Sequence, residues 1–151
     1  MRMLRATDLG AVAEMFDRLS DTSRYRRFFS AGAAGPRREL AYLPTVDGHD
    51  RVALVAIVDN RVVGLARYHV GECCSADVAI VVEDAYQHAG LGRRLMIELT
   101  QAARRQHVDE FAISVLGDNA PAMRLLRGLV PDVGLGLDHG VYEARVPLLA
   151  S

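Results

Sequence analysis

The chain has little of several residue types, and each shortage narrows what the protein can be. It has no tryptophan, and its two cysteines, Cys73 and Cys74, are adjacent. A disulfide between neighbouring residues is strained. With no further cysteine, the chain has neither a disulfide framework nor a cysteine-based zinc site. We therefore expect a reducing, cytoplasmic location and no metal.

An excess of one charge and a long apolar run are also missing. The 18 Lys and Arg against 19 Asp and Glu give a formal net charge of −1. Nucleic-acid binding favours a basic surface, so no nucleic-acid partner is expected. No apolar run approaches the roughly 18–20 residues of a membrane span. The first eight residues carry too many charges for a signal peptide, so no membrane partner is expected either.

What remains is the composition of an ordinary globular domain. Of the 151 residues, 50% are hydrophobic and 25% are charged. A chain of this length can bury one substantial core. We therefore expect a single domain over residues 1–151, without internal repeats or linkers.

The hydrophobic spacing alternates between helical and strand-like periods along the chain. Helical spacing predicts helices over Leu9–Leu19, Arg24–Phe29, Arg37–Leu43, Gly90–Gln106 and Pro121–Leu129. Apolar runs between turn signals predict strands over Met3–Ala6, Arg51–Asp59, Arg61–Val70, Cys73–Val82, Phe111–Leu116, Val133–Leu137 and Val141–Val146. This order predicts an α+β fold with a mixed sheet of about seven strands.

A glycine-rich loop lies between a predicted strand and a predicted helix. Gly90 and Gly92 leave backbone N–H groups open to a ligand just where the helix begins. The helix dipole adds roughly half a positive charge there, and Arg93 and Arg94 add full charges. The segment Gln87–Gly92 therefore predicts a phosphate site. The plainer alternative is a tight turn with solvated arginines.

Two common nucleotide motifs do not fit this loop. The P-loop requires Gly-Lys-Ser/Thr, which is missing. The dinucleotide fingerprint requires a third glycine, and that position is Leu95. The spacing favours an acyl-CoA instead.

Four segments resemble the GNAT family of N-acetyltransferases. Val82–Leu95 is similar to the Gln/Arg-x-x-Gly-x-Gly/Ala acetyl-CoA motif and the strand before it, and Leu116–Leu125 is similar to the Asn-x-x-Ala-x-x-Leu helix of the family. Ser20–Phe29 and Gly64–Tyr68 resemble the acetyltransferase domain of bacterial Pat-type protein-lysine acetyltransferases. Pat-type proteins often carry a fused nucleotide-binding or synthetase module, which this sequence does not contain.

The resemblance implies a fold, a cosubstrate and a reaction. The sheet would be mostly antiparallel and flanked by helices, with acetyl-CoA in a splayed opening between the fourth and fifth strands. A primary amine, either a protein lysine or a small amine, would attack the thioester directly, with a general base removing its proton. The residues expected to bind the cofactor are Val81, Val82, Gln87, His88, Ala89, Gly90, Leu91, Gly92, Arg93 and Asn119.

Asp77 is the candidate general base, because it stands where the Pat-like pattern has a glutamate. A carboxylate in an apolar strand is costly to bury, and burial would raise its pKa towards a useful range. The alternative is a structural aspartate paired with Arg67 or His69, which would lower its pKa. Both interpretations remain open at this point.

For the other charged residues near the loop, the sequence supports less specific expectations. Arg24, Arg26 and Arg27 are interpreted as the rim of the acceptor pocket or as salt-bridged surface, able to favour an acidic acceptor or to contact the CoA 3′-phosphate. Glu83 and Asp84 are expected to be solvated.

The chain departs from the family pattern at two places. Leu126 replaces the tyrosine that usually protonates the leaving thiolate, and Val130-Pro131 replaces a Gly-Phe pair. These departures motivate an alternative function as a non-catalytic acyl-CoA-binding or interaction module. A structural dimerisation domain is a third hypothesis, because the last strands of such folds often pair between subunits. A homodimer is compatible with all three.

Overall fold

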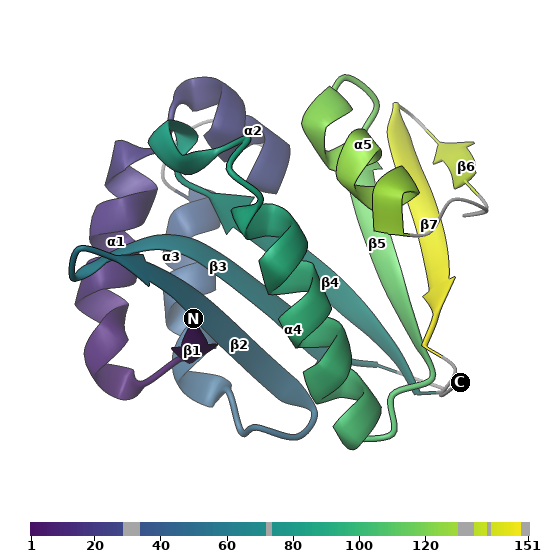
Figure 1. Ribbon diagram of the computed structural model, residues 1–151, viewed down its shortest axis with the longest axis horizontal. Coiled ribbons are helices and arrows are strands. Elements are labelled where there is room, and N and C mark those ends of the chain that lie inside the picture. The colour runs from purple at the N-terminus through teal and green to yellow at the C-terminus, as the bar shows by residue number, and fades with distance from the viewer. Residues whose placement is uncertain (29–33, 72–73, 130–134, 139, 149–151) are drawn as a thin grey trace.

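A twisted sheet forms the centre of the protein, as a computed structural model shows for residues 1–28, 34–71, 74–129, 135–138 and 140–148 (Figure 1). The strands in these ranges are β1 (Arg2–Met3), β2 (Arg51–Val58), β3 (Arg61–Val70), β4 (Ser75–Val82), β5 (Glu110–Leu116), β6 (Leu135–Asp138) and β7 (Val141–Pro147). The helices are α1 (Leu9–Arg18), α2 (Asp21–Phe28), α3 (Ala34–Tyr42), α4 (Leu91–Arg105) and α5 (Ala120–Leu129).

The sheet is mixed and mostly antiparallel, which confirms the predicted α+β class. Its order in the described part of the chain is β1-β2-β3-β4-β5-β7-β6. Strands β4 and β5 are parallel, and the other neighbouring pairs are antiparallel. The turn between β2 and β3 has positive φ angles of 51° at Asp59 and 63° at Asn60, the geometry that a tight hairpin requires.

The first strand is shorter than predicted and ends at Met3 instead of Ala6. Residues Ala6–Asp8 form a short 3₁₀ turn instead. The cause is Asp8, whose buried carboxylate accepts hydrogen bonds from the Arg5 amide at 2.7 Å and from the Arg2 guanidinium at 2.7 and 2.8 Å. The predicted starts of two other strands, at Cys73 and Val133, lie outside the described residues.

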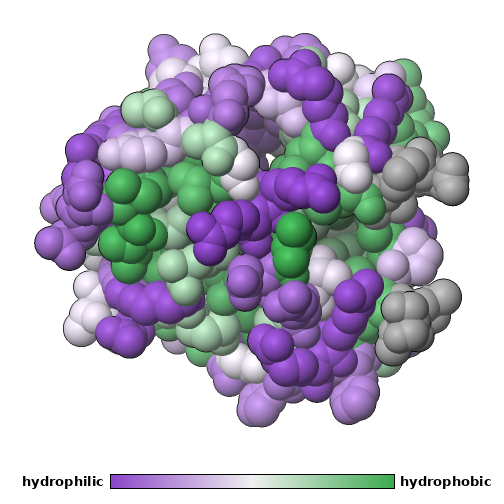
Figure 2. All heavy atoms as spheres, viewed as in Figure 1, coloured by the Kyte–Doolittle hydropathy of each residue, from purple (hydrophilic) through white to green (hydrophobic). Residues whose placement is uncertain are grey.

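Helices cover both faces of the sheet (Figure 1). On one face, the buried residues of α1 and its C-cap follow helical spacing and pack on the sheet; they are Val12, Met15, Phe16 and Leu19. On the other face, Leu95, Leu99 and Ala102 of α4 are buried, while Leu91 is half-buried. Hydrophilic side chains dominate the outer surface on the α4 side, and that surface is hollowed between the parts that carry α4 and α5 (Figure 2).

Strands β4 and β5 separate along their length. They pair from Ser75–Glu110 to Val78–Ile113 and no further. Beyond that point β4 pairs with β3 alone and β5 pairs with β7 alone. The fold therefore contains the opening between the fourth and fifth strands that the resemblance implied, and Figure 1 shows the two strands diverging towards α5.

Candidate active site

A cavity of about 260 Å³ lies between β4, the start of α4 and the start of α5. It brings together eight of the ten residues expected to bind the cofactor. These are Val81, Val82, Gln87, His88, Gly90, Gly92, Arg93 and Asn119. Ala89 is exposed and Leu91 packs on the hydrophobic core, so neither side chain lines the cavity.

The glycine-rich loop presents uncapped backbone N–H groups to this cavity. Gly90 adopts φ 83°, a left-handed conformation that glycine tolerates, and α4 begins directly after it without a side-chain cap. The first helical bond runs from the Arg94 amide to the Gly90 carbonyl at 3.1 Å. The preceding N–H groups of the first turn have no partner within the helix. Such a helix start is suited to an anion.

The side chain of Gln87 stabilises the loop through hydrogen bonds to neighbouring elements. Its Nε2 atom donates hydrogen bonds to the Val82 carbonyl at 2.9 Å and to Ser23 Oγ at 3.2 Å. The loop is thereby fixed both to the end of β4 and to α2. The backbone N–H of Gln87 is engaged as well, because it donates to the Asp84 carbonyl at 3.3 Å. Gln87 therefore fixes the shape of the loop whose following N–H groups face the cavity.

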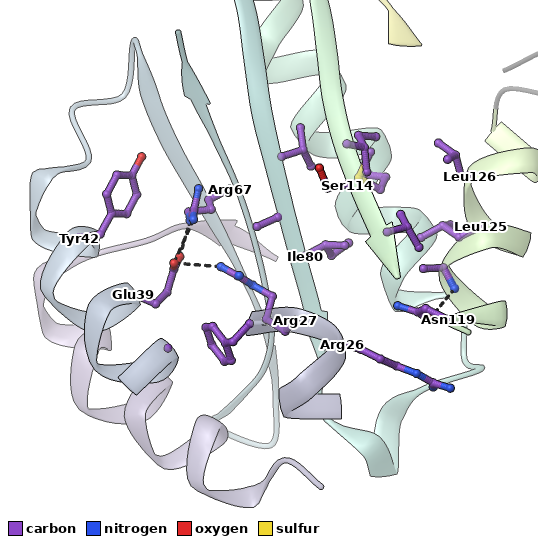
Figure 3. Close-up of a pocket in the computed structure, with 18 of the residues that line it drawn as sticks. Arg26, Arg27, Glu39, Tyr42, Arg67, Ile80, Ser114, Asn119, Leu125 and Leu126 are labelled. Carbon is purple, nitrogen blue, oxygen red and sulfur yellow. Dashed lines mark hydrogen bonds and ion pairs between the residues drawn. The ribbon is translucent and has the colours of Figure 1, made fainter. Parts of the chain in front are cut away.

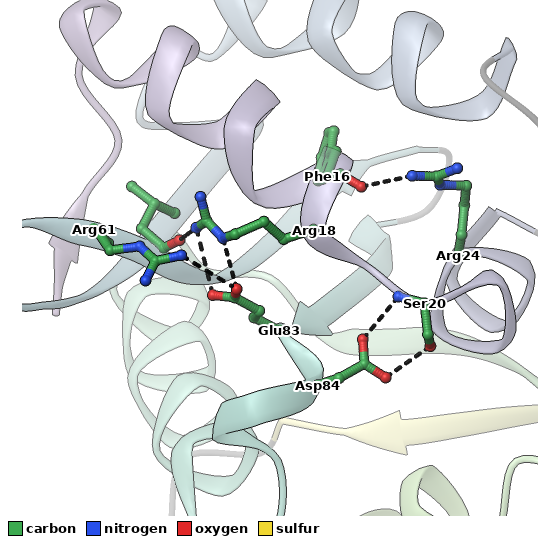
Figure 4. A network of polar contacts seen from close by, with 8 residues as sticks. Phe16, Arg18, Ser20, Arg24, Arg61, Glu83 and Asp84 are labelled. Carbon is green, nitrogen blue, oxygen red and sulfur yellow. Dashed lines mark hydrogen bonds and ion pairs between the residues drawn. The ribbon is translucent and has the colours of Figure 1, made fainter.

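Two carboxylates hold the loop in place (Figure 4). Asp84 is exposed, as expected, whereas Glu83, also expected to be solvated, is not. Glu83 is buried and lies 2.6 Å from Arg18 and 3.7 Å from Arg61. Asp84 accepts hydrogen bonds from the Ser20 amide and hydroxyl at 3.0 and 2.7 Å, and from the Ser23 hydroxyl at 2.8 Å. Partial burial opposes ionisation, but these hydrogen bonds outweigh it, and the pKa of Asp84 lies below its ordinary value.

A second cavity, of about 460 Å³, continues from the first through the opening between β4 and β5. Its walls include Val78, Ala79 and Ile80 of β4 and Ile113, Ser114 and Val115 of β5. Because Ile80, Asn119, Ala122 and Leu125 line both cavities, the two form one continuous groove.

Asn119 stands at the junction of the two cavities. Its Oδ1 accepts a hydrogen bond from the Ala122 amide at 3.2 Å and so caps α5. Across the groove, Nη2 of Arg26 donates to the Asp118 carbonyl at 3.2 Å and links α2 to the segment before α5. Asn119 therefore caps α5, and its position is compatible with a cofactor contact.

A buried ionic cluster forms the wall of the larger cavity away from the glycine-rich loop (Figure 3). Glu39 of α3 is 5% exposed. Arg67 of β3 donates hydrogen bonds to both of its carboxylate oxygens, and Nη2 of Arg27 lies 2.9 Å from Oε2. The Arg67 guanidinium also lies 4.6 Å from the centre of the Tyr42 ring. Burial lowers the pKa of Arg27.

The sequence did not single out Glu39 or Tyr42. Glu39 belongs to no recognised motif and lies 28 positions before Arg67. The only available signal was an acidic residue on an otherwise apolar helix face, which is common. Arg27, expected at the pocket rim or on a salt-bridged surface, is salt-bridged but nearly buried.

Asp77 is the third residue of β4 and lies opposite His69 of β3 and Ala112 of β5. Its side chain is exposed, so the expected burial is not found. Within the described ranges, neither Arg67 nor His69 forms an ion pair with it. Ala79, two residues further on and on the same face of the strand, lines the larger cavity, whereas Asp77 does not. Leu126, where the family pattern has tyrosine, is buried and also lines this cavity.

Comparisons with known proteins agree with this geometry. Acetyltransferase PA5475 of Pseudomonas aeruginosa is 32% identical over 112 residues, which is 70% of this chain and 59% of that protein's length. The GNAT domain of S. lividans PAT superposes with a TM-score of 0.86 at 22% identity, covering 97% of this chain and 88% of that one. The structure of yncA from Salmonella typhimurium contains its cofactor acetyl-CoA. It superposes with a TM-score of 0.79 at 19% identity, covering 99% of this chain and 94% of that one.

The two solved structures share the fold, and the curated relative shares sequence as well. The relative extends beyond the matched region, since the match spans only 59% of its length. The family model described as acetyltransferase (GNAT) family matches residues 14–129, most of the length of this chain. With its splayed sheet and glycine-rich helix start, the chain belongs to the GNAT family of acetyltransferases.

Proposed function

We propose that the protein is an acetyl-CoA-dependent N-acetyltransferase that moves an acetyl group to a primary amine. The observation that carries this proposal is the continuous groove that joins the uncapped start of α4 to the opening between β4 and β5. Family membership supports acetyl-CoA as the acyl donor, since the similar structure of yncA contains acetyl-CoA. The acceptor is either a protein lysine or a small amine.

Acetyl-CoA would supply the activated acyl group. The backbone N–H groups that follow Gln87, up to Arg93, would hold its pyrophosphate. Arg93 and Arg124, which line the smaller cavity, carry the matching positive charge. The pantetheine arm would pair with the free edge of β4 near Val81 and Val82, because that edge has no partner strand beyond Val78. This pairing would bring the thioester to the opening.

The reaction forms one bond and breaks one. The amine nitrogen bonds to the thioester carbonyl carbon, the carbon–sulfur bond breaks, and CoA leaves as a thiolate. A backbone N–H near Val82 would polarise the carbonyl. Asp77 would accept the proton of the amine as general base. Since Ala79 lines the cavity and Asp77 precedes it by two residues, about 7 Å along the strand, the proton would pass through an intervening water.

The leaving thiolate requires little help at this site. A thiol has a pKa of about 8.5, so the thiolate departs readily near neutral pH. Leu126, buried in the cavity wall, offers no proton where the family pattern has tyrosine. The absence of a proton donor at Leu126, together with the exposure of Asp77, favours the second candidate function. That candidate is a non-catalytic acyl-CoA-binding or interaction module.

Release of CoA thiol from acetyl-CoA, measured with a panel of amines and lysine peptides, separates the two candidates. For the enzyme, at least one acceptor raises release above background. Asp77→Asn lowers that rate about 100-fold or more, the usual scale for loss of a general base. Asp17→Asn, at an exposed site on α1, is the matched control and leaves the rate unchanged. Binding of acetyl-CoA without any stimulated release would instead establish the binding module.

A further inference from the structure

The larger cavity carries excess positive charge at the end away from the glycine-rich loop. Arg27 and Arg67 share a single carboxylate, that of Glu39. Among the described lining residues Glu39 is the only acidic one, while Arg38 adds further positive charge. Arg26 lines the smaller cavity as well and lies on the Asn119 side. The cluster of Arg27, Arg67 and Glu39 therefore has one guanidinium charge without a counter-charge.

Burial makes this excess charge costly. The exposed fractions of the side chains are 10% for Arg27, 18% for Arg67 and 5% for Glu39. Removing ions from water is unfavourable unless each is paired and hydrogen-bonded. Desolvation also lowers the pKa of Arg27 despite the neighbouring carboxylate. A bound anion would supply the missing partner.

The Tyr42 hydroxyl also indicates that a polar partner binds in this cavity. It is buried, and no described residue accepts or donates a hydrogen bond to it. A buried hydroxyl without a partner costs stability, so a native protein usually provides one. Tyr42 packs against Arg67, and Figure 3 shows both with Glu39 and Arg27 on one side of the pocket, opposite Leu125 and Leu126.

We infer that the acceptor is a free amino acid or a close derivative, whose carboxylate binds at Arg67 and Tyr42 while its amine faces the opening between β4 and β5. The inference rests on the proposed function and narrows it. Arg27 lines both cavities, but Glu39, Tyr42 and Arg67 line the larger one only. CoA held in the smaller cavity around Gln87–Arg93 would therefore leave the Arg67 and Tyr42 end of the cluster without a partner.

The size and the walls of the cavity favour a small acceptor. A volume of about 460 Å³ is in the range of small-molecule pockets. Apolar side chains of Ile113, Leu125, Leu126 and Leu129 form much of the rest of the wall and would receive an apolar side chain. One surplus positive charge matches one carboxylate, and a guanidinium binds a carboxylate with two parallel hydrogen bonds.

Calorimetric titration of the CoA-saturated protein with L-leucine and with L-leucinamide tests the inference. L-Leucinamide carries a neutral carboxamide where L-leucine carries the carboxylate, and its side chain is the same. L-Leucine should bind at least about tenfold more tightly. Arg67→Gln should abolish that preference while leaving Glu39 paired with Arg27, and Tyr42→Phe should reduce it. Arg104→Gln, at an exposed position of α4, is the control and keeps the preference. Thermal melting confirms that each variant is folded.

Equal binding of the two compounds, no binding of either, or a preference that survives Arg67→Gln would overturn the inference. Since CoA carries no acetyl group, this titration does not depend on turnover. A carboxylate preference without acetyl transfer from acetyl-CoA would contradict the proposed function alone. Acetyl transfer to amines or lysine peptides without such a preference would contradict the inference alone.

Discussion

At the residue scale, Glu39 is the side chain on which most of the acceptor side of the cavity depends. It holds Arg27 of α2 and Arg67 of β3 together across elements that are distant in sequence. Its carboxylate is buried, and its two partners are largely buried as well. The cluster therefore fixes how α2 and α3 lie on the sheet.

Replacing Glu39 by alanine should destabilise the protein strongly. The change leaves two buried guanidinium groups without their carboxylate, and breaking a buried pair in this way costs about 3–5 kcal/mol. The free energy of unfolding in urea measures the effect. Glu98→Ala, at an exposed position of α4, should change it by less than about 0.5 kcal/mol. Similar values for the two variants would show that the cluster does not stabilise the fold.

Gln87 gives a second prediction at this scale. Gln87→Ala removes the hydrogen bonds to Val82 and Ser23, which should lower the free energy of unfolding by about 1–2 kcal/mol and weaken acetyl-CoA binding. Urea unfolding and calorimetric titration measure the two effects, with Gln101→Ala at an exposed site of α4 as the control. Unchanged acetyl-CoA affinity would mean that the loop holds its conformation without this side chain.

At the element scale, α2 is fixed to the segment after β4 by Asp84. Its hydrogen bonds from Ser20 and Ser23 join residues more than 60 positions apart. The same segment begins with Glu83, which is held by Arg18 of α1. The start of the glycine-rich loop is therefore braced from two helices on the opposite face of the sheet.

The stabilisation that the Asp84 carboxylate provides through these hydrogen bonds should depend on pH. The pKa of Asp84 is lower in the folded protein than the ordinary value of about 3.9. Its contribution is therefore present above the unfolded pKa and is lost as the pH falls through the folded one. The free energy of unfolding should decline below about pH 4, and Asp84→Asn should make that decline shallower. An identical pH dependence in the variant would exclude Asp84 as a contributor.

The sequence predicted elements better than it predicted contacts between them. Helix α4, the strands β2 and β3 and the loop before α4 depend on the spacing of neighbouring residues, so local patterns revealed them. The Glu39 cluster and the exposure of Asp77 depend on which segments cover each face of the sheet. Local spacing does not encode that information, and without it a charged residue on a strand or a short helix is ambiguous.

At the scale of the whole molecule, the splay of β4 and β5 divides the protein into two parts around one groove. The side that carries β1–β4 has its own hydrophobic cluster with α1, and the other side carries β5–β7 and α5. No helix in the described ranges is long and apolar enough to cross a bilayer. A ligand in the groove would contact both parts.

Binding in the groove should therefore stabilise the molecule as a whole. Acetyl-CoA at 100 times its dissociation constant should raise the free energy of unfolding by about 2.7 kcal/mol. Thermal or urea unfolding with and without acetyl-CoA measures the gain. A Gly92→Glu variant, which places a carboxylate in the smaller cavity, should lose most of it, whereas the exposed Gly136→Glu variant should retain it.

Backbone hydrogen exchange with and without acetyl-CoA tests the central claim most directly, because it reports the place of binding as well as its occurrence. Binding in the groove predicts slower exchange at the first amides of α4, from Gly90 to Arg93, and along the unpaired edge of β4 from Ala79 to Val82. Unchanged exchange at both segments in the presence of saturating acetyl-CoA would contradict the claim that this groove holds the cofactor.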